Sequence, residues 1–552
     1  MEAIAKVGEQ MNLESPAKVE GMQEAYSRRS GSPLTDAFFI LALTGLFLLP
    51  AALNGFPFVM EDSIAYSGEG TNWMRPAFAA VLASPLYHLI GYWSLPVIMA
   101  LLSAVAWVSF CSEFNCRRWL PLAVPLAVLS LQPVYTSAVL VDGLFFPAIV
   151  FMILAIRRKN LAFALVAGCL LSSHGSGVPL AAVLTLVAAL LLRSRAALIF
   201  GGLTVLVALG VGMALHAKYD NGLPTLGKTF LAARLFSVEP TLLGDECRKS
   251  GNQSLCEAEA ELKIIKTLPG NKNRRDLFWD VKSRMGERFD MVDFERNHAL
   301  PIVWHGLTSQ PVRFAGIILQ DWLSFYLPRT RFDFRATLDE PMPTAYYKSL
   351  QSKGMMQSSA ARDIATGLRY AFYITLAFGL FTARKILSGS EWRWSATILL
   401  LCLANDLLFA IVSGPPDRYH HRILPVAALV ALLALARALE ARRKAESHLN
   451  PGSDEVPPMI IVSLTYVMPI EAVEAQLEGH IAWLKEGYES GMLIASGRKV
   501  PRTGGVLLAK GDLDDVKAFC ARDPFAVHGV ATYDFTQAAI SMTAPGLEGL
   551  KD

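Results

Sequence analysis

Charged residues are scarce in this sequence, and it lacks the motifs of soluble nucleotide-binding or nucleic-acid-binding proteins. Of its 552 residues, 18% are charged and 53% are hydrophobic, which exceeds the balance of an ordinary globular protein. The formal net charge is only +3, and no long basic block with interleaved aromatics occurs, so we expect no nucleic-acid partner. The stretch LGKTF lacks the upstream glycine spacing of a P-loop. The composition therefore predicts a membrane protein with soluble parts.

Cysteines are also few, and none has the paired spacing of a zinc site. The seven cysteines are scattered along the chain without a CxxC motif. Cys247 and Cys256, in DECRKSGNQSLC, are the only pair in a polar segment. We expect them to form a disulfide if this segment lies outside the cytoplasm, because disulfides persist in oxidising compartments.

Long apolar runs, in contrast, are abundant. A helix needs about 20 apolar residues to cross roughly 30 Å of hydrocarbon. The sequence predicts about ten such spans, at 37–54, 94–111, 119–136, 141–156, 161–176, 177–192, 197–216, 367–383, 396–413 and 421–438. We therefore expect a multi-pass α-helical membrane domain over 37–440, after a polar N-terminal segment at 1–36.

Lysine and arginine clusters occur at every second boundary between the predicted spans. Such clusters mark the cytoplasmic side of a membrane protein. We therefore expect both termini in the cytoplasm of a bacterial-type inner membrane, with a large exported loop at 217–366. The apolar segments 74–90 and 312–327 would break this alternation if they crossed, so we expect them to lie at the membrane surface.

Several acids fall on the predicted exported face. Glu61 and Asp62 follow the first span in NGFPFVMEDS, where they could equally be solvated loop residues. Asp142 lies at the outer end of a later span, in VLVDGLFF. An acid at such a position is costly to desolvate, so a functional role is the default hypothesis for Asp142.

Basic residues share this face with the acids. Arg418, His420 and His421 occur in PPDRYHHR, between the last two predicted spans. An arginine and histidine group can neutralise a lipid phosphate while a carboxylate removes a proton from an acceptor hydroxyl. The competing interpretation is a membrane transporter or sensor with ion sites in its spans. The charges gather at one face rather than at the midplane, which argues against a transporter.

This layout resembles the GT-C superfamily of polyprenyl-phosphate-sugar glycosyltransferases over residues 35–440. The shared features are an acid after the first span, the turn Arg75-Pro76 before a surface helix, a further acid near later spans, and a late RY-plus-basic loop. The sequence has Glu-Asp at 61 and 62 where many relatives have Asp-Glu or Asp-Asp, which leaves open which of the two is the base.

The resemblance implies glycosyl transfer from an isoprenoid-phosphate-linked sugar, with membrane lipid as a partner. It makes Asp62 or Glu61 the base or a metal-assisted acid, and Asp142 a residue that positions the acceptor or a divalent metal. It assigns the donor phosphate to the basic residues of PPDRYHHR, namely Arg418, His420 and His421.

The pattern changes after a polar linker at 441–458. MIIVSLTY predicts a strand, and the segment after Pro469 predicts an amphipathic helix that ends before Gly491. Two further strands, a helix and a final strand follow. The order βαββαβ predicts a ferredoxin-like α+β domain over 459–552.

This segment resembles the YCII-related family of small α+β proteins of the dimeric α/β-barrel type. The resemblance rests on HIAWL, the following SG, GGVLLA and RDPFAVHGV. It implies a homodimer and an acid/base pair of His480 and Asp523, flanked by Ser496 and Arg498. A carboxylate orients an imidazole and raises its basicity. From the residues alone, Asp523 could instead cap a turn. A further alternative makes this pair the only catalytic site of the chain.

Overall fold

The computed structural model divides the chain into two compact units, Met1–Leu439 and Glu440–Asp552. It describes residues 33–68, 75–219, 223, 225, 227–272, 274, 277–326, 332, 334–338, 341–413, 417–449, 459–540, 543, 547 and 550. Most of the predicted N-terminal segment and the second half of the predicted linker lie outside these residues. The first half of that linker is helical, because the last helix of the first unit continues to Leu449.

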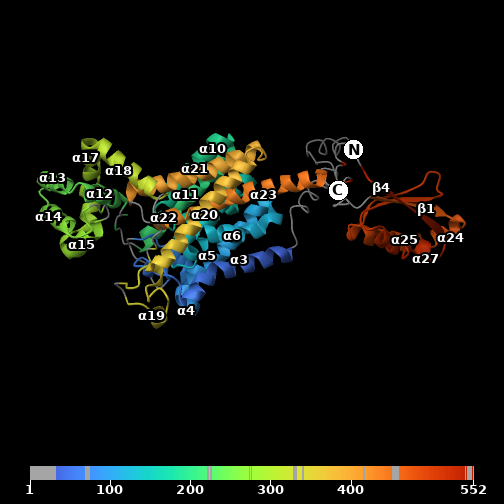
Figure 1. Cartoon of the computed structure of the whole chain (residues 1–552), viewed down its shortest axis with the longest axis horizontal. Helices are drawn as coiled ribbons and strands as arrows, with labels where there is room; N and C mark the ends of the chain where they lie inside the picture. Colours follow the sequence, from blue (N-terminus) through green and yellow to red (C-terminus); the bar gives the residue numbers. More distant parts are fainter. Residues whose placement is uncertain are drawn as a thin grey trace, which may run out of the picture. The chain divides into compact units, whose positions relative to one another are not determined.

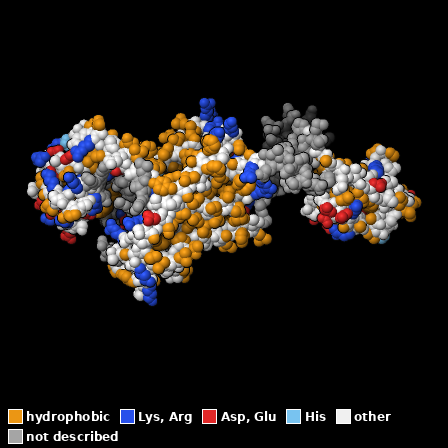
Figure 2. Space-filling view, viewed as in Figure 1, with side chains coloured by type: hydrophobic (Ala, Val, Ile, Leu, Met, Phe, Trp, Pro, Cys, Tyr) orange, Lys and Arg blue, Asp and Glu red, His pale blue; other side chains and the backbone are white. Residues whose placement is uncertain are grey.

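The described part of the first unit is almost entirely helical (Figure 1). Its bundle helices are α3 (Pro33–Asn54), α4 (Phe78–Ile90), α5 (Ser94–Glu113), α6 (Ala123–Leu129), α7 (Gln132–Thr136), α8 (Asp142–Arg158), α9 (Leu161–Leu171), α10 (Gly177–Leu192), α11 (Gly202–Tyr219), α20 (Ser359–Ala383), α21 (Gly389–Val412), α22 (Asp417–His421) and α23 (Leu424–Leu449). Figure 2 shows a broad belt of hydrophobic side chains over this bundle, as expected of a surface that contacts lipid.

Six helical segments among the described residues are long and apolar enough to cross a membrane. The chain is therefore an integral membrane protein, but the predicted count of about ten spans is not confirmed. The predicted span 119–136 is broken into short pieces, because Leu131 adopts a left-handed conformation with φ 59° between α6 and α7. Hydropathy alone does not detect such a break.

The segment predicted to lie at the membrane surface at 74–90 belongs to one of the six candidates. It forms α4, which leads through a short turn at Gly91–Trp93 into α5. Gly91 has φ 55°, a value that favours glycine, and α4 packs back against α5. With 13 residues, α4 is about 20 Å long and does not cross a bilayer by itself.

Helix α8 forms the centre of the bundle. Every residue from Asp142 to Ile156 is buried, and α8 packs against α5 and α9. Gly143, next to Asp142, lies so close to Met99 that an added Cβ would meet the Met99 sulfur at 2.6 Å. A helix that is apolar on all sides is expected at such a position. The packing also fixes where Asp142, at its first turn, can point.

The two ends of the bundle differ in charge. At one end, Arg157 and Arg158 at the end of α8 both donate to Glu113, at 2.8 and 2.7 Å. Arg437 donates to Glu391 at 2.8 Å, and Arg117 pairs with Asp36. Several of the predicted basic clusters thus meet at the same end. Asp142, at the start of α8, lies at the other end.

A separate lobe follows α11 and has its own hydrophobic core. It contains α12 (Gly227–Val238), α13 (Thr241–Ser250), α14 (Gln253–Thr267), α15 (Phe278–Met285), α16 (Met291–Asp293), α17 (Ala299–Ser309) and α18 (Pro311–Ser324). Helices α12 and α18 contact the span α21. Helix α18 includes residues 312–324 of the segment predicted at 312–327, and it is not one of the six candidate spans.

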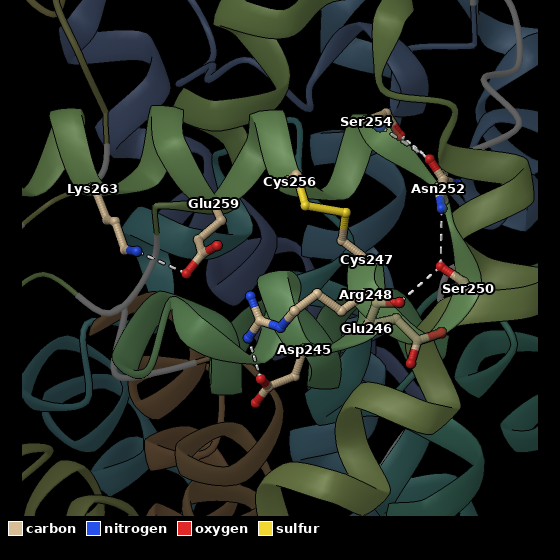
Figure 3. Close-up of a disulfide and its surroundings, with 10 residues drawn as sticks. All are labelled: Asp245, Glu246, Cys247, Arg248, Ser250, Asn252, Ser254, Cys256, Glu259 and Lys263. Atoms are coloured by element: carbon tan, nitrogen blue, oxygen red, sulfur yellow. Dashed lines mark hydrogen bonds and ion pairs between the residues drawn. A yellow bond between two sulfur atoms is a disulfide. The ribbon is translucent and has the colours of Figure 1, made fainter.

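A disulfide between Cys247 and Cys256 joins α13 to α14 in this lobe (Figure 3). The two Cα atoms are 5.6 Å apart. Asn252 caps α14 between them, since its side chain accepts from the backbone N–H of Ser254 at 3.1 Å. The disulfide predicted between the two cysteines of DECRKSGNQSLC is therefore present in this lobe.

The second unit contains a four-stranded antiparallel sheet in the order β2-β3-β1-β4. Its elements are β1 (Met459–Tyr466), α24 (Ile470–Glu474), α25 (Leu477–Glu489), β2 (Leu493–Arg498), β3 (Gly504–Ala509), α26 (Leu513–Cys520), α27 (Pro524–Val527) and β4 (Ala531–Ala538). In the central strand, Val462 lies opposite Leu507 on one side and Phe535 on the other. The element order is that of the predicted ferredoxin-like unit. Strands β2 and β4 are the two edges.

Candidate functional site

The loop after α3 is tied to the chain segment that precedes α8. Phe58 donates its N–H to the Ser137 carbonyl at 3.2 Å, and Val139 donates to the Phe58 carbonyl at 2.8 Å. The Gln351 amide also exchanges two hydrogen bonds with the backbone of Val59, at 3.0 and 2.6 Å. These bonds place the loop that carries Asp62 beside the start of α8, although about 80 residues separate them in the sequence.

Asp62 lies between two arginines from distant parts of the chain. Arg75 donates to Asp62 Oδ1 from Nε and Nη2 at 3.1 and 2.5 Å, and Arg418 donates to Oδ2 from both terminal nitrogens at 3.4 Å. The three side chains are 15 to 22% exposed. Burial raises the pKa of Asp62, but the two guanidinium charges outweigh this effect and hold it below its ordinary value. Asp62 is therefore ionised at neutral pH.

Tyr66 places Asp62 and Asp142 in one electrostatic neighbourhood. This buried tyrosine has a pKa raised above its ordinary value, chiefly by burial, and the charges of both carboxylates contribute to the rise. Arg75 and Arg418 oppose it. The structure thus brings together two of the acids and one of the bases that the sequence singled out, along with Arg75.

Asp142 faces a different arginine, Arg422. Arg422 Nη1 lies 3.6 Å from Asp142 Oδ1, an ion pair that is too long for a hydrogen bond. Neither of these two atoms has a hydrogen-bond partner within the described residues, and both are fully buried. The pair is therefore electrostatically matched but not satisfied as a hydrogen bond.

Arg422 itself is firmly held. It donates to Asn405 Oδ1 from Nε and Nη2 at 3.1 and 2.8 Å, and to Ser176 Oγ at 2.8 Å. The rings of Phe145 and Phe409 lie 4.4 and 4.5 Å from its guanidinium carbon. A guanidinium held by hydrogen bonds and aromatic faces has one orientation. That orientation directs its remaining nitrogen at Asp142.

His420 and His421, expected at a lipid phosphate, are both buried. His420 Nδ1 lies 2.8 Å from Asp406, its other nitrogen contacts the Tyr373 hydroxyl, and Tyr326 donates to the same Asp406 oxygen at 2.6 Å. His421 Nδ1 lies 3.0 Å from the Tyr135 hydroxyl. Both imidazoles therefore belong to internal networks, and their positions give no support to a phosphate-binding role.

The acids do not form a common ligand set for a metal. Glu61 pairs with the exposed Arg335 at 3.1 Å, away from Asp62, which pairs with Arg75 and Arg418. Among the residues described here, no group of three or more histidine, cysteine, aspartate or glutamate side chains is arranged to hold a metal ion. These residues therefore do not fit a divalent metal at the predicted acids.

The second unit brings His480 and Asp523 together. His480 Nδ1 lies 2.8 and 2.9 Å from the two Asp523 oxygens, and its ring stacks on Phe525 at 4.0 Å. Asp523 is fully buried, caps α27 through the Phe525 N–H at 3.0 Å, and accepts from the Tyr533 hydroxyl at 2.5 Å. Burial, followed by this hydrogen bond and the Asp523 charge, raises the pKa of Tyr533. Asp523 therefore caps α27 and binds His480 at the same time.

Ser496 and Arg498, expected to flank this pair, are on strand β2. This is an edge strand of the sheet, whereas Tyr533, which binds Asp523, is on the opposite edge strand β4. Ser496 accepts from the Tyr488 hydroxyl at 2.6 Å, near the end of α25. Ser496 thus contacts α25, the helix that carries His480, and the expected cleft stays a prediction.

The sequence interpretation did not identify the residues that hold the bundle site together. Asn405 and Asp406 were counted only as parts of an apolar run, although ILLLCLANDLLFA has a polar pair in its middle, and Arg422 was given no role, although it ends the motif PPDRYHHR. Ionisable residues within membrane segments are functional hypotheses by default, and that rule would have selected them. Arg75 was noted only as part of the turn before a surface helix, and its contact with Asp62, 13 residues earlier in the chain, was not predicted.

Comparisons with known proteins give different information for the two units. The first resembles a crystal structure of ArnT from Cupriavidus metallidurans bound to undecaprenyl phosphate, at 13% identity, over 77% of this chain and 82% of that chain. The TM-score of 0.27 is too low to support a structural argument. Among curated proteins, none matches the sequence. Residues 459–537 match the family model of the YCII-related domain. The chain is thus an integral membrane protein that carries a C-terminal YCII-related domain.

Proposed function

We propose that the membrane unit is a glycosyltransferase that binds a polyprenyl-phosphate-linked sugar through Arg75 and Arg418. The observation that carries this proposal is the convergence of two guanidinium groups on Asp62 at an accessible end of the bundle. Two positive charges against one carboxylate leave an excess of one positive charge. Guanidinium groups bind phosphate oxygens in pairs, and phosphate can compete with a carboxylate for them.

The position of this group suits a lipid phosphate. The hydrophobic belt of the bundle (Figure 2) would hold the polyprenyl chain. Arg75 and Arg418 pair with Asp62 in the loop that follows α3, at the end of the helices where the head group would lie. We place this end on the exported side of a bacterial-type inner membrane, with both termini cytoplasmic, because Arg117, Arg157 and Arg158, from two of the predicted basic clusters, lie at the other end. Reporter fusions at residues 250 and 450 test this orientation and must report opposite compartments.

Binding of undecaprenyl phosphate to the full chain in lipid nanodiscs tests the phosphate site. We expect Arg418→Gln and Arg75→Gln each to weaken binding at least tenfold, because each removes one charged donor. Arg335→Gln is the matched control, since Arg335 is an exposed arginine that pairs with Glu61. Equal affinity in all variants would exclude the site. Absence of sugar release from polyprenyl-phosphate sugars, with intact binding, would favour a transporter or sensor.

A second candidate activity belongs to the YCII-related domain. We infer that His480 acts there as a general acid or base, because Asp523 fixes its Nδ1 while its Nε2 makes no hydrogen bond to any described residue. Tautomer control by a buried carboxylate is a recurrent device of acid/base sites. Ligand screening by thermal shift of the full chain, compared with His480→Gln, tests this inference. A ligand that binds both equally would place its site elsewhere.

A further inference from the structure

Helix α22 carries Arg418 but is too short to hold its own orientation. It has five residues, and a single helical turn is unfavourable by itself, so contacts with the rest of the chain must fix its position. Arg418 and His420 are two residues apart, which places their side chains about 200° apart around the helix axis. A rotation of α22 that moved His420 away from its partners would therefore also move Arg418 away from Asp62.

His420 anchors α22 on the bundle. Its Nδ1 lies 2.8 Å from Asp406 on α21, and its Nε2 contacts the hydroxyl of Tyr373 on α20. Because a carboxylate only accepts, Nδ1 carries the proton, and in the neutral ring Nε2 accepts from Tyr373. The side chains of His420 and Asp406 are 2% and 1% exposed. Both helices are candidate spans, so His420 is held by the bundle itself.

The chain segment after α18, the last helix of the separate lobe, supplies a further donor to this carboxylate. Tyr326 donates to Asp406 Oδ2 at 2.6 Å, and this is the oxygen that also binds His420. The Asn405 amide donates to the other oxygen, Oδ1, at 3.0 Å. Three donors from different directions give the carboxylate one orientation. The orientation of His420 therefore depends on a residue that follows the lobe.

Aromatic contacts join the same segment to α22. The rings of Phe325 and Tyr326 lie 5.7 and 5.1 Å from the His420 imidazole. Phe325 also belongs to a small hydrophobic cluster with Tyr419, the residue next to Arg418. The Tyr419 hydroxyl accepts from Arg418 Nη2 at 2.9 Å. Helix α18 itself packs on α21 (Figure 1). The lobe and the arginine are thus linked through a continuous set of contacts.

We propose that Tyr326 is a positioning residue for the donor-phosphate site. The Tyr326 hydroxyl fixes the Asp406 carboxylate, and the carboxylate fixes His420. His420 in turn fixes α22, the helix that directs Arg418 at Asp62. This inference rests on the proposed function and adds that the packing of the lobe on the bundle orders one of the two phosphate-binding arginines.

A double-mutant cycle, with binding of undecaprenyl phosphate to the full chain in nanodiscs as the readout, tests this role. Tyr326→Phe removes the hydroxyl and keeps the ring against His420. We expect it to weaken binding about fivefold in the wild type and in Arg75→Gln, but by less than about twofold in Arg418→Gln, because its effect passes through Arg418. A general loss of structure would instead weaken binding by the same factor in all three backgrounds.

Two further variants complete the cycle. Tyr373→Phe removes the hydroxyl at the other nitrogen of His420, and we expect the same pattern across the three backgrounds. Tyr347→Phe is the matched control, because Tyr347 is 59% exposed and its hydroxyl accepts only a backbone N–H, that of Met342, among the printed distances at 3.3 Å. We expect its affinity to equal that of the wild type.

Wild-type affinity in both Tyr326→Phe and Tyr373→Phe, while Arg418→Gln weakens binding, would overturn the positioning role and leave the proposed function intact. Equal losses in all three backgrounds would also overturn it, since they would show a structural role alone. If the wild type does not bind undecaprenyl phosphate, the proposed function fails and the positioning role fails with it.

Discussion

In the membrane unit, carboxylates at one end of the bundle face arginines, whereas in the C-terminal unit the buried carboxylate of Asp523 faces a histidine and a tyrosine. An arginine keeps its charge at every physiological pH, so its pairing with a carboxylate fixes charge and geometry. A histidine changes charge near neutral pH, so its pairing with a carboxylate prepares a proton transfer.

The comparison also separates the two acids of the membrane unit. Asp62 is saturated by donors at a partly exposed position, while Asp142 is fully inside the fold with one long ion pair. A buried charge is costly unless a partner compensates it, and Arg422 is the partner of Asp142. The contacts of each carboxylate, rather than its position in the sequence, therefore distinguish the two acids.

The largest expected effect comes from breaking the buried pair in the membrane unit. Arg422→Gln should lower the stability of the full chain by about 3 to 5 kcal/mol, because it leaves Asp142 buried opposite a neutral group. Unfolding in mixed detergent micelles measures this loss. The double variant Asp142→Asn with Arg422→Gln should recover part of it. A single variant as stable as Arg335→Gln would contradict the pairing.

Removal of the buried carboxylate in the C-terminal unit should have a somewhat smaller effect. Asp523→Ala leaves the His480, Phe525 and Tyr533 donors without an acceptor, at a cost of about 2 to 3 kcal/mol. Hydrogen exchange of β1 and β4 amides in the full chain localises the loss to this unit. Unchanged protection would show that Asp523 does not hold the domain together.

Acid should destabilise the membrane unit by protonating Asp62. Its pKa lies below the ordinary value of 3.8, so its stabilising contribution is present above that pH and disappears as the pH falls through the lower folded value. We expect Asp62→Asn to unfold with a weaker dependence on pH below about 4 than the wild type. Thermal melts of the full chain from pH 6 to 3 measure this dependence. The same dependence of melting temperature on pH in both proteins would contradict the ion pairs of Asp62.

The smallest expected effect concerns Tyr533. Its pKa is raised, so the folded state favours the neutral phenol, and this contribution is lost as the pH rises above about 10. Tyr533→Phe should cost about 1 kcal/mol at neutral pH through the lost hydrogen bond to Asp523. The same substitution should weaken the alkaline destabilisation of the β4 amides. An unaltered alkaline profile would assign that titration to another group.

Sequence patterns predicted much of the fold because hydropathy and alternation are local. The two-unit division, the helical bundle and the βαββαβ order are all local patterns. The number of long spans was not, because helix length is set by the fold: Leu131 breaks the run at 119–136, and α8, α9 and α10 have only 17, 11 and 16 residues. Strand order is likewise a property of the fold, so the placement of Ser496 on the edge strand opposite β4 could not be inferred.

Site residues were predictable only where a residue type is unusual for its position or belongs to a family motif. Asp142 and Asp62 stood out by their positions at span ends, and His480 and Asp523 by family resemblance. The pairing of Arg418 with Asp62 and of Arg422 with Asp142 did not, because these residues meet across the fold. The sequence therefore named Asp62 and Arg418 but could not predict that they pair.

The position of a bound lipid phosphate would show directly whether Arg75 and Arg418 form the donor site. A cryo-electron microscopy map of the full chain in nanodiscs with undecaprenyl phosphate would locate it. We predict phosphate density within hydrogen-bond distance of the Arg75 and Arg418 guanidinium groups, with Asp142 and Arg422 unoccupied by phosphate. Phosphate density at Arg422, or at any site that leaves the contacts of Arg75 and Arg418 with Asp62 unchanged, would contradict the account.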